Sequence, residues 1–435
     1  MLTIIALGGC APPPSSEPVE SPEPDEVRQR CPVPDPAAAP IVDGGPPPES
    51  PARGLWWYLE DGAANDAVSA ELMALANLGY VAGLEVPKLV DGVLVNEADA
   101  RDGLAFYTSG HGAVAVLMDL EGEERHRWGM PFEALWPERI VDDRRSDHQY
   151  WRRAALRPNG DVLAIIEGQG LIRLDWNSEV VWSWGGGAHH DLEVLPDERV
   201  WVLSRQARMR WDVNHRPLLE DFVTRLDAEG CPEVQISLLD AVLASSAGEA
   251  FLAGYPDGDV FHTNSLRVLD DAMADAHPAF QPGHLLLSMR TPSGLVVLDP
   301  DTAEVVWWWQ GPFREQHDPE ITRDGHLMVF DNIGLGENQS AVRAFGLEDG
   351  EEAWRIDQID GTPLRSRYLG AVQELDAGHL LITESNQGHA FELNARREVV
   401  WSFRNPERAG PRRNFVAVIP EMLRIPHDYL TRALD

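Results

Sequence analysis

The chain has 435 residues, and its 36 Lys and Arg against 71 Asp and Glu give a formal net charge of −35. A charge of this sign and size argues against a nucleic-acid backbone or an anionic membrane surface as partner. Hydrophobic residues at 43% and charged residues at 25% are ordinary for a globular protein with a large core. No stretch is long and apolar enough to predict a membrane-spanning helix.

The first ten residues predict a lipid anchor. A short apolar stretch ends in Leu7-Gly8-Gly9-Cys10, and small residues before a cysteine suit a signal peptidase cleft. The pattern resembles the lipobox of bacterial lipoproteins, which implies a signal peptide over residues 1–10 and a lipid on Cys10. The alternative is a buried strand that ends in Gly-Gly-Cys. Because Ala11 is not aspartate, the resemblance favours the outer membrane, facing the periplasm or the cell surface.

Residues 11–53 predict a disordered tether. A large share of the 33 prolines lies between Pro12 and Pro51, among Glu, Asp, Ser and Ala, and such a segment buries too little apolar surface to offset its ordering entropy. Residues 54–102 predict a short helix at Asn65 to Leu78 and lead-in strands. An oxidising envelope would permit a bridge between Cys31 and Cys231.

Residues 103–406 predict a repeat. Short β-rich runs separated by Asp-Gly or Asn-Gly turns recur at a spacing of about fifty residues, the size of a four-stranded propeller blade. The clearest copies begin at Arg157, Gly283 and Gly378, and weaker ones cover 103–128, 189–240 and 317–357. Six copies predict an all-β, six-bladed β-propeller, with 407–435 as a C-terminal extension. A solenoid is the alternative architecture.

Tryptophans recur in the last strand of the copies, and we expect them to pack between neighbouring blades. A cofactor-stacking role, as in quinone-binding propellers, is the alternative, but we predict no cofactor. The residues are Trp182, Trp307, Trp354 and Trp401.

Histidines fall at one register of the repeat. Seven residues before the turn of each copy lie Arg152, His190 and His317, with His262 at the equivalent place in the fourth copy and Tyr368 close by in the sixth. Each precedes the first strand of its copy. Because the first strand of a propeller blade is innermost, we expect these side chains to line one mouth of the axial funnel.

Imidazole and guanidinium groups in one funnel predict group-transfer chemistry. Neutral imidazole is a nucleophile and a general base near neutral pH, and arginine binds tetrahedral oxyanions through its fork of donors. These properties suit sulfuryl or phosphoryl groups. Three histidines that hold zinc or copper are the alternative, which would make the protein a metal-dependent oxidoreductase.

Five short stretches have a recognisable pattern. They are His189-His190-Asp191, Phe261-His262-Thr263-Asn264-Ser265, Ser288-Met289-Arg290, Gln316-His317-Asp318-Pro319 and Phe330-Asp331-Asn332. They resemble the bacterial arylsulfotransferase family, whose members are propellers that move a sulfuryl group between phenols without a nucleotide donor, and the resemblance covers roughly Gly54 to Pro406. It implies a small-molecule aryl sulfate and a phenol as substrates, and it implies that His262 and His317 grip the sulfate through N–H donors.

We therefore expect His262, His317 and His389 to be catalytic. Substrate binding is expected from His190, Arg152, Asn264, Arg290 and Asn332. His389 is the nearest candidate for the histidine that family members sulfurylate, although Glu384-Ser385-Asn386 occupies a similar position.

The sequence departs from the family in one arginine. Family members carry it shortly after the Phe-Asp-Asn stretch, where this chain has Ile333 to Glu337. Arg290, Arg343 and Arg152 are the candidates to replace it. A non-catalytic propeller lipoprotein that binds a protein or polymer at the same funnel is the alternative function.

Overall fold

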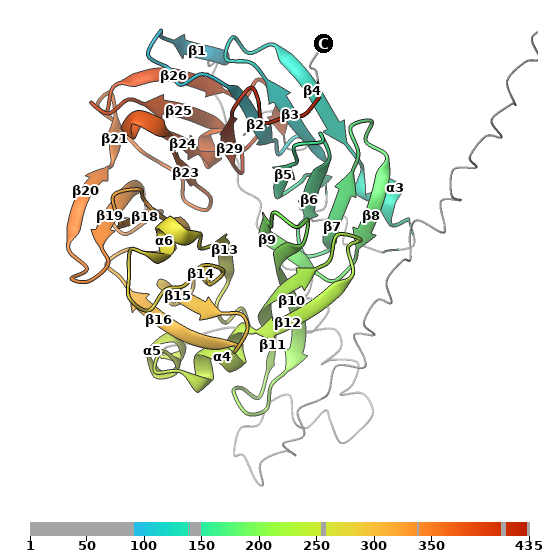
Figure 1. The fold of residues 1–435 in the computed structure, drawn as a ribbon, viewed down its shortest axis with the longest axis vertical. Helices are drawn as coiled ribbons and strands as arrows, with labels where there is room; N and C mark the ends of the chain where they lie inside the picture. Colours follow the sequence, from blue (N-terminus) through green and yellow to red (C-terminus); the bar gives the residue numbers. More distant parts are fainter. Residues whose placement is uncertain are drawn as a thin grey trace, which may run out of the picture.

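The computed structural model describes residues 91–137, 139, 149–253, 258–336, 339–409 and 415–432. Six antiparallel sheets of strands surround a common axis (Figure 1), which confirms the predicted six-bladed β-propeller. The described part of the chain contains no helix long and apolar enough to cross a membrane.

Each blade is a meander in which the strands follow one another outward from the axis. The innermost strand is given first for each blade. Blade 1 contains β29 (Met422–Ile425), β2 (Leu104–Thr108), β3 (Val114–Met118) and β4 (Glu124–Gly129). Blade 2 contains β5 (Arg153–Leu156), β6 (Val162–Ile166), β7 (Gly170–Leu174) and β8 (Val180–Trp184). Blade 3 contains β9 (Ala188–Val194), β10 (Val200–Met209), β11 (Pro217–Leu226) and β12 (Pro232–Ser237).

The second half of the ring repeats this order. Blade 4 contains β13 (Thr263–Val268), β14 (Leu285–Met289), β15 (Gly294–Asp299) and β16 (Glu304–Gln310). Blade 5 contains β17 (His317–Ile321), β18 (His326–Asp331), β19 (Ala341–Gly346) and β20 (Glu352–Ile356). Blade 6 contains β23 (Ala371–Glu374), β24 (Leu380–Glu384), β25 (His389–Leu393) and β26 (Val399–Arg404), with β1 (Gly92–Asn96) as a fifth, outermost strand.

The two ends of the described chain close the ring, and this corrects the predicted boundaries. Strand β29 pairs with β2, with Leu104 opposite Ile425, so the predicted extension 407–435 supplies the innermost strand of the first blade. Strand β1 pairs with β26, with Val93 opposite Phe403. The propeller therefore extends beyond 103–406 at both ends, because a closed ring needs pairing between segments far apart in the sequence.

The hydrophobic core lies between the blades. Six clusters of buried apolar side chains fill the six interfaces between neighbouring blades. Alternate residues of a strand point to opposite faces, so Leu104 and Phe106 of β2 pack against blade 2, while Ala105 and Tyr107 pack against blade 6. The strands therefore read as continuous apolar runs, since both faces of each blade are covered.

The predicted packing role of the tryptophans is confirmed most directly at two positions. The indole Nε1 of Trp182 donates to the Ala228 carbonyl of the next blade at 3.0 Å, and that of Trp401 donates to the Leu120 carbonyl at 3.0 Å. Trp354 stacks under the Arg397 guanidinium of the next blade at 4.8 Å. Trp307 packs in the cluster between blades 4 and 5.

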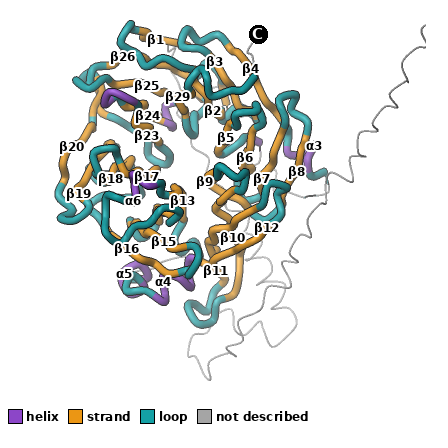
Figure 2. Tube along the Cα trace, in the orientation of Figure 1, coloured by secondary structure: helices purple, strands orange, loops and turns teal. Residues whose placement is uncertain are grey.

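Helices are few and short among the described residues (Figure 2). They are α3 (Phe132–Leu135), α4 (Leu238–Ala244), α5 (Gly248–Leu252), α6 (Asp271–Ala274), η3 (Asp376–Gly378) and η4 (Ser385–Gln387). Two small hairpins complete the fold, β21 (Gln358–Ile359) with β22 (Thr362–Pro363) and β27 (Arg408–Ala409) with β28 (Phe415–Val416).

Several predictions fall outside the described residues. They are the lipid site at Cys10, the tether over 11–53 and the helix at Asn65 to Leu78. Cys231 is disulfide-bonded, and its partner lies outside the described part of the chain, so the pairing with Cys31 stays a prediction.

Candidate functional site

The predicted funnel residues come together at one mouth of the axis. Arg152, His190, His262 and Arg290 line a cavity of about 20 Å³. Glu167, Tyr368 and Leu369 complete its lining. The strands explain this convergence, because Arg152 directly precedes β5, His190 lies in β9 and His262 directly precedes β13, the innermost strands of three successive blades.

Backbone strain concentrates at this mouth. His190 and His262 adopt φ values of 54° and 48°, and Asp318, beside His317, adopts 50°. These left-handed conformations are costly for residues other than glycine, by roughly 1–3 kcal/mol each. The innermost strand shifts register against its neighbour close to each of these residues, between Ala188 and Leu192, between Thr263 and Ser265, and between His317 and Glu320. Bulges of this kind re-aim side chains, and here they occur at or next to the histidine position of three blades.

His262 is paired with a carboxylate that the sequence pattern did not indicate. Its Nδ1 lies 2.6 Å from Oδ2 of Asp259, and the His262 ring lies 4.9 Å from the His190 ring. A carboxylate oxygen accepts, so Nδ1 carries the proton and donates it to Asp259. In the neutral ring Nε2 is then the basic nitrogen, as in other histidine–carboxylate pairs.

His317 is held in one tautomer by Asn332. The Asn332 amide donates to the carbonyls of Ser366 and Leu369 at 2.6 and 2.9 Å, so its oxygen faces the histidine. His317 Nδ1 donates to that oxygen at 2.8 Å and approaches the Glu315 carbonyl at 3.1 Å. Asn332 is therefore a positioning residue for His317.

Burial, together with the nearby Arg152 charge, lowers the pKa of His317 well below its ordinary value. The ring is therefore neutral near pH 7, and with the proton on Nδ1 its Nε2 carries a lone pair. This geometry favours a proton acceptor over the N–H donor that the family resemblance implied. His317 does not itself line the 20 Å³ cavity, although its ring is close enough to sense Arg152, Arg290 and His262 electrostatically.

A buried chain of titratable groups leads away from His190. Its Nδ1 lies 2.9 Å from Nδ1 of His189, and Nε2 of His189 lies 3.6 Å from Oδ1 of Asp221. Burial lowers the pKa of both histidines well below the ordinary value. Burial, followed by the nearby Asp259 charge, raises the pKa of Asp221 to about 7. Both histidines are therefore neutral near pH 7, and Asp221 is the group of this chain whose charge changes near neutral pH.

A metal site, if present, would use a different set of residues from the predicted one. Within the described ranges, the group whose ligand atoms lie close enough together is Glu167, His189 and His190, rather than His190, His262 and His317. The Glu167 carboxylate already has counter-charges, because Arg205 Nη2 lies 3.2 Å from its Oε1 and Arg152 Nε lies 3.9 Å from its Oε2. The charge of the Glu167 carboxylate is therefore already balanced by Arg205 and Arg152, and no metal cation is needed to neutralise it.

The candidate arginines separate into two groups. Arg152 and Arg290 line the cavity, and Arg290 forms an ion pair with Glu315. Arg343 instead donates to Asp331 at 2.9 Å and also pairs with Glu352. Arg343 is thus held by two carboxylates of its own blade, and it is not among the residues that line the cavity.

Two other predicted site residues do not reach the cavity. His389 begins β25, the third strand from the axis, and its Nδ1 lies 3.5 Å from Oε2 of Glu384. Asn264 is buried and donates to the Gln316 carbonyl of the next blade at 2.8 Å. The structure therefore places Asn264 in a contact between blades and leaves His389 apart from the funnel cluster.

Sequence reasoning missed Glu167, Asp259 and Asp221. Glu167 follows the end of β6, Asp259 lies in the approach to β13, and Asp221 lies in β11. None occupies the repeat register that revealed the histidines, so spacing gave no signal for them.

Comparison with known proteins identifies the family. The model of the arylsulfotransferase (ASST) family matches residues 153–406, more than half of the chain. No curated protein matches the chain. Among solved structures, a protein of unknown function from Bacteroides caccae is 11% identical, with 75% of this chain and 99% of that chain covered and a TM-score of 0.48. Virginiamycin B lyase from Staphylococcus aureus is 10% identical, with 73% and 86% covered and a TM-score of 0.41.

Those TM-scores are low, and the two likenesses add nothing to the assignment. The family match begins at Arg153, directly after Arg152, and spans blades 2 to 6. The matched residues include His190, His262, Arg290 and His317. The chain therefore belongs to the arylsulfotransferase family.

Proposed function

We propose that the protein transfers a sulfuryl group from an aryl sulfate to a phenolic acceptor without a nucleotide donor. The observation that carries the proposal is the convergence of Arg152, Arg290, His190 and His262 on one small cavity. Two guanidinium groups supply charge for the sulfuryl oxygens, and a carboxylate-paired imidazole supplies a nucleophile at the same place.

The size of the cavity indicates how a substrate lies. A volume of about 20 Å³ holds little more than one water molecule, so a sulfuryl oxygen would enter the cavity and the sulfur would lie at its opening. The aryl part must then lie at the rim, where Tyr368 lines the cavity and is 44% exposed. The Arg367 guanidinium stacks on the Tyr368 ring at 5.3 Å and pairs with Glu315 at 2.5 Å, which holds this rim in place.

The geometry favours His262 as the nucleophile in place of His389. Its Nε2 would attack sulfur, the bond between sulfur and the aryl oxygen would break, and the phenolate would leave with the electron pair. Asp259 stabilises the positive charge that forms on the sulfurylated ring, through the bond at 2.6 Å. Arg152 and Arg290 stabilise the charge on the sulfuryl oxygens.

The second half of the reaction needs a base for the acceptor. Nε2 of His317, unprotonated because the ring is neutral, would take the proton of the phenol. The phenol oxygen would then bond to sulfur, the bond between nitrogen and sulfur would break, and His262 would return to its neutral state. His317 would pass its proton to the departing phenolate of the next cycle or to water.

Release of a coloured phenol from nitrophenyl sulfate, with and without an added phenol, tests the proposal. We expect acceptor-dependent release that falls at least a hundredfold in His262→Ala. His427→Ala is the matched control, because His427 is exposed and far from the cavity lining. Full turnover in His262→Ala would contradict the assignment.

The missing family arginine favours a second candidate, a non-catalytic propeller that binds a protein or polymer at the same mouth. The loop that follows Asn332 carries Ile333 to Gly336 in place of the family arginine. If the wild-type protein releases no phenol from several aryl sulfates, with or without added phenols, this second function is favoured.

The proposed place of action is the bacterial cell envelope, at the outer membrane by the lipobox resemblance, with the protein held by lipid on Cys10. The support is the Leu7-Gly8-Gly9-Cys10 pattern and the proline-rich segment after it. Labelling with radioactive palmitate, lost in Cys10→Ala, tests the anchor. Unchanged labelling in that variant would contradict it.

A further inference from the structure

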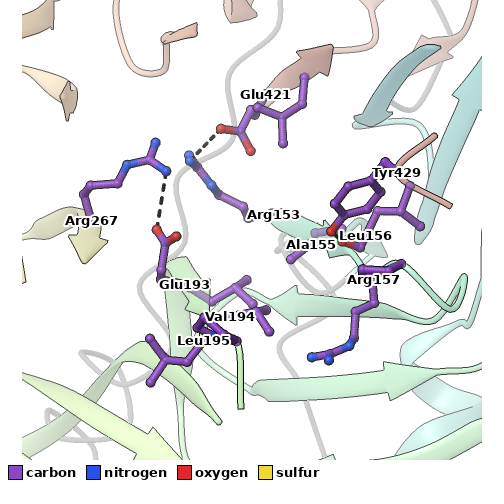
Figure 3. A pocket seen from close by; sticks show the side chains of 15 residues that line it. Arg153, Ala155, Leu156, Arg157, Glu193, Val194, Leu195, Arg267, Glu421 and Tyr429 are labelled. Carbon is purple, nitrogen blue, oxygen red and sulfur yellow. Dashed lines mark hydrogen bonds and ion pairs between the residues drawn. The ribbon is translucent and has the colours of Figure 1, made fainter. Parts of the chain in front are cut away.

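One arginine of an innermost strand contacts carboxylates from three other parts of the ring. Nε of Arg153, which begins β5, lies 2.8 Å from Oδ1 of Asp191. Its Nη2 lies 2.6 Å from Oε1 of Glu421 and 3.5 Å from Oδ1 of Asp318, and Figure 3 marks the contact with Glu421 by a dashed line. We call these four residues the axial hub. Their side chains are 14% exposed or less.

The axial hub crosses the ring. Asp191 lies in β9 of blade 3, Asp318 in β17 of blade 5, and Glu421 directly precedes β29 of blade 1. Blades 2 and 5 are opposite each other in a ring of six, so the contact between Arg153 and Asp318 spans the axis. Arg153 and Glu421 also line a cavity of about 380 Å³, whose lining residues differ from those of the funnel cavity (Figure 3). The hub therefore lies between the two cavities.

Backbone N–H groups hold the two aspartates of the hub in place. Oδ2 of Asp191 accepts from the Leu266 N–H of blade 4, and Oδ2 of Asp318 accepts from the Val372 N–H of blade 6, each at 2.8 Å. The Asp318 N–H itself donates to the Ser265 hydroxyl at 2.8 Å. Each aspartate therefore has one carboxylate oxygen near the hub arginine and the other on the backbone of a further blade, so the cluster contacts all six blades.

Three members of the hub directly follow a funnel residue. The pairs are Arg152 with Arg153, His190 with Asp191, and His317 with Asp318. Because consecutive Cα atoms are about 3.8 Å apart, a side chain that is fixed at the axis also restrains the backbone of the residue before it. Glu421 differs, since the residue before it is Pro420, which is not one of the funnel residues.

The same pairs carry the strained backbone at the mouth. The φ value is 54° at His190 and 50° at Asp318, both in the left-handed region that residues other than glycine seldom adopt. Such conformations persist only where the surrounding contacts over-determine them. The contacts of Asp191 and Asp318 with Arg153 and with the backbone of blades 4 and 6 supply that restraint.

We propose that the axial hub positions the funnel histidines: Asp191 and Asp318, held by Arg153, fix the strained backbone that aims His190 and His317 at the funnel. Both aspartates are positioning residues, each acting through the histidine before it. For His317 this role complements that of Asn332, which fixes the tautomer of the ring. The effect of the hub on turnover rests on the proposed sulfuryl transfer, whereas its effect on the placement of the rings does not.

The titration of His317, followed by NMR in the full chain with histidines labelled at Cε1, tests the proposal, and His317→Gln identifies the signal. Burial is the main cause that holds the pKa of His317 well below its ordinary value, so a ring displaced into contact with water has a higher pKa. We expect a rise of at least one pH unit in Asp318→Ala. Glu421→Gln is the matched control, because it changes a hub carboxylate that follows no funnel residue, and it should leave the titration of His317 unchanged.

Phenol release from nitrophenyl sulfate gives a second readout. Asp318→Ala should lower kcat at least tenfold, because His317 is the proposed base for the acceptor and a misplacement of about 1 Å can cost about a hundredfold in rate. The KM should stay within twofold of the wild type, since Arg152 and Arg290 still hold the sulfuryl oxygens. An unchanged kcat would show that the hub does not position the base. If the wild type releases no phenol, the proposed function fails and the titration of His317 alone decides the role of the hub.

Arg153→Lys keeps the test decisive if Asp318→Ala fails to fold. Lysine retains a positive charge among the three carboxylates but loses the guanidinium fork that reaches them together. We expect the pKa values of His190 and His317 both to rise by at least half a pH unit. An unchanged titration of His317 in Asp318→Ala and Arg153→Lys, or an equal rise in Glu421→Gln, would overturn the proposal.

Discussion

Asp259→Asn tests the role of the histidine–carboxylate pair. The carboxylate oxygen lies 2.6 Å from His262 Nδ1, and the side chains of His262 and Asp259 are only 5% and 13% exposed. Asparagine keeps the shape but removes the charge that stabilises a sulfurylated, positively charged ring. It also presents an N–H group that can reverse the tautomer and place the proton on Nε2, the attacking nitrogen.

The size of the effect follows from the bond that is lost. A hydrogen bond to a charged group contributes about 1.5–3 kcal/mol, and at about 1.4 kcal/mol per factor of ten this predicts a fall in kcat of roughly 10- to 150-fold. The KM for nitrophenyl sulfate should change little, because Arg152 and Arg290 still hold the sulfuryl oxygens.

The assay is phenol release under steady-state conditions with saturating acceptor. The control is Asp197→Asn, which makes the same chemical change at a carboxylate whose side chain is 52% exposed and which pairs with Arg199. A wild-type kcat in Asp259→Asn would refute the assignment of His262 as the nucleophile. A fall in stability without a change in kcat would give the pair a purely structural role.

Three further predictions concern stability and the choice of arginine. Burial raises the pKa of Glu421 to about 7, so the folded protein holds a proton there in acid and loses it as the pH rises through 7, which lowers the free energy of unfolding. Glu421→Gln has no such proton to lose, so its free energy of unfolding, measured with urea, should rise relative to the wild type by up to about 3 kcal/mol between about pH 5 and 8, and a difference that does not change with pH would contradict this. Trp401→Phe loses the indole hydrogen bond to the Leu120 carbonyl, so the free energy of unfolding should fall by about 1 kcal/mol and the Tm should be lower. An unchanged Tm would show that this hydrogen bond does not stabilise the fold. Arg290→Gln should raise KM at least tenfold, while Arg343→Gln should lower the Tm and leave KM unchanged; the reverse result would make Arg343 the substrate arginine.

The repeat could be predicted from the sequence because each blade is local. A hairpin turn, an apolar strand and a closing tryptophan recur within about fifty residues, and β6, β14 and β24 fall within the copies that the sequence revealed. The register of His190, His262 and His317 was visible for the same reason, since it is measured from the turn of each copy.

Long-range pairing was not visible in the sequence. Strand β29 is only four residues long and has no turn or tryptophan of the repeat, and its place beside β2 depends on closure of the whole ring. Closure is a property of six stacked blades rather than of any one segment, so the predicted boundary at residue 406 was too early.

The distance of each strand from the propeller axis could not be predicted from the sequence either. His389 and His317 look alike as strand residues in the sequence, but His317 begins an innermost strand and His389 begins the third strand of its blade. Asp259 reaches His262 through a local bend of the chain, and its carboxylate gave no periodic signal. Sequence spacing therefore identified which blades contribute to the mouth, whereas the partners of each side chain needed the structure.

The most direct test of the central claim is the mass of the protein and its peptides after an aryl sulfate is added without acceptor. The account predicts one added sulfuryl group, located on the peptide that contains His262, absent from His262→Ala and lost when a phenol is added. A sulfuryl group on His389, or a protein that turns over the donor and never carries the group, would contradict the mechanism.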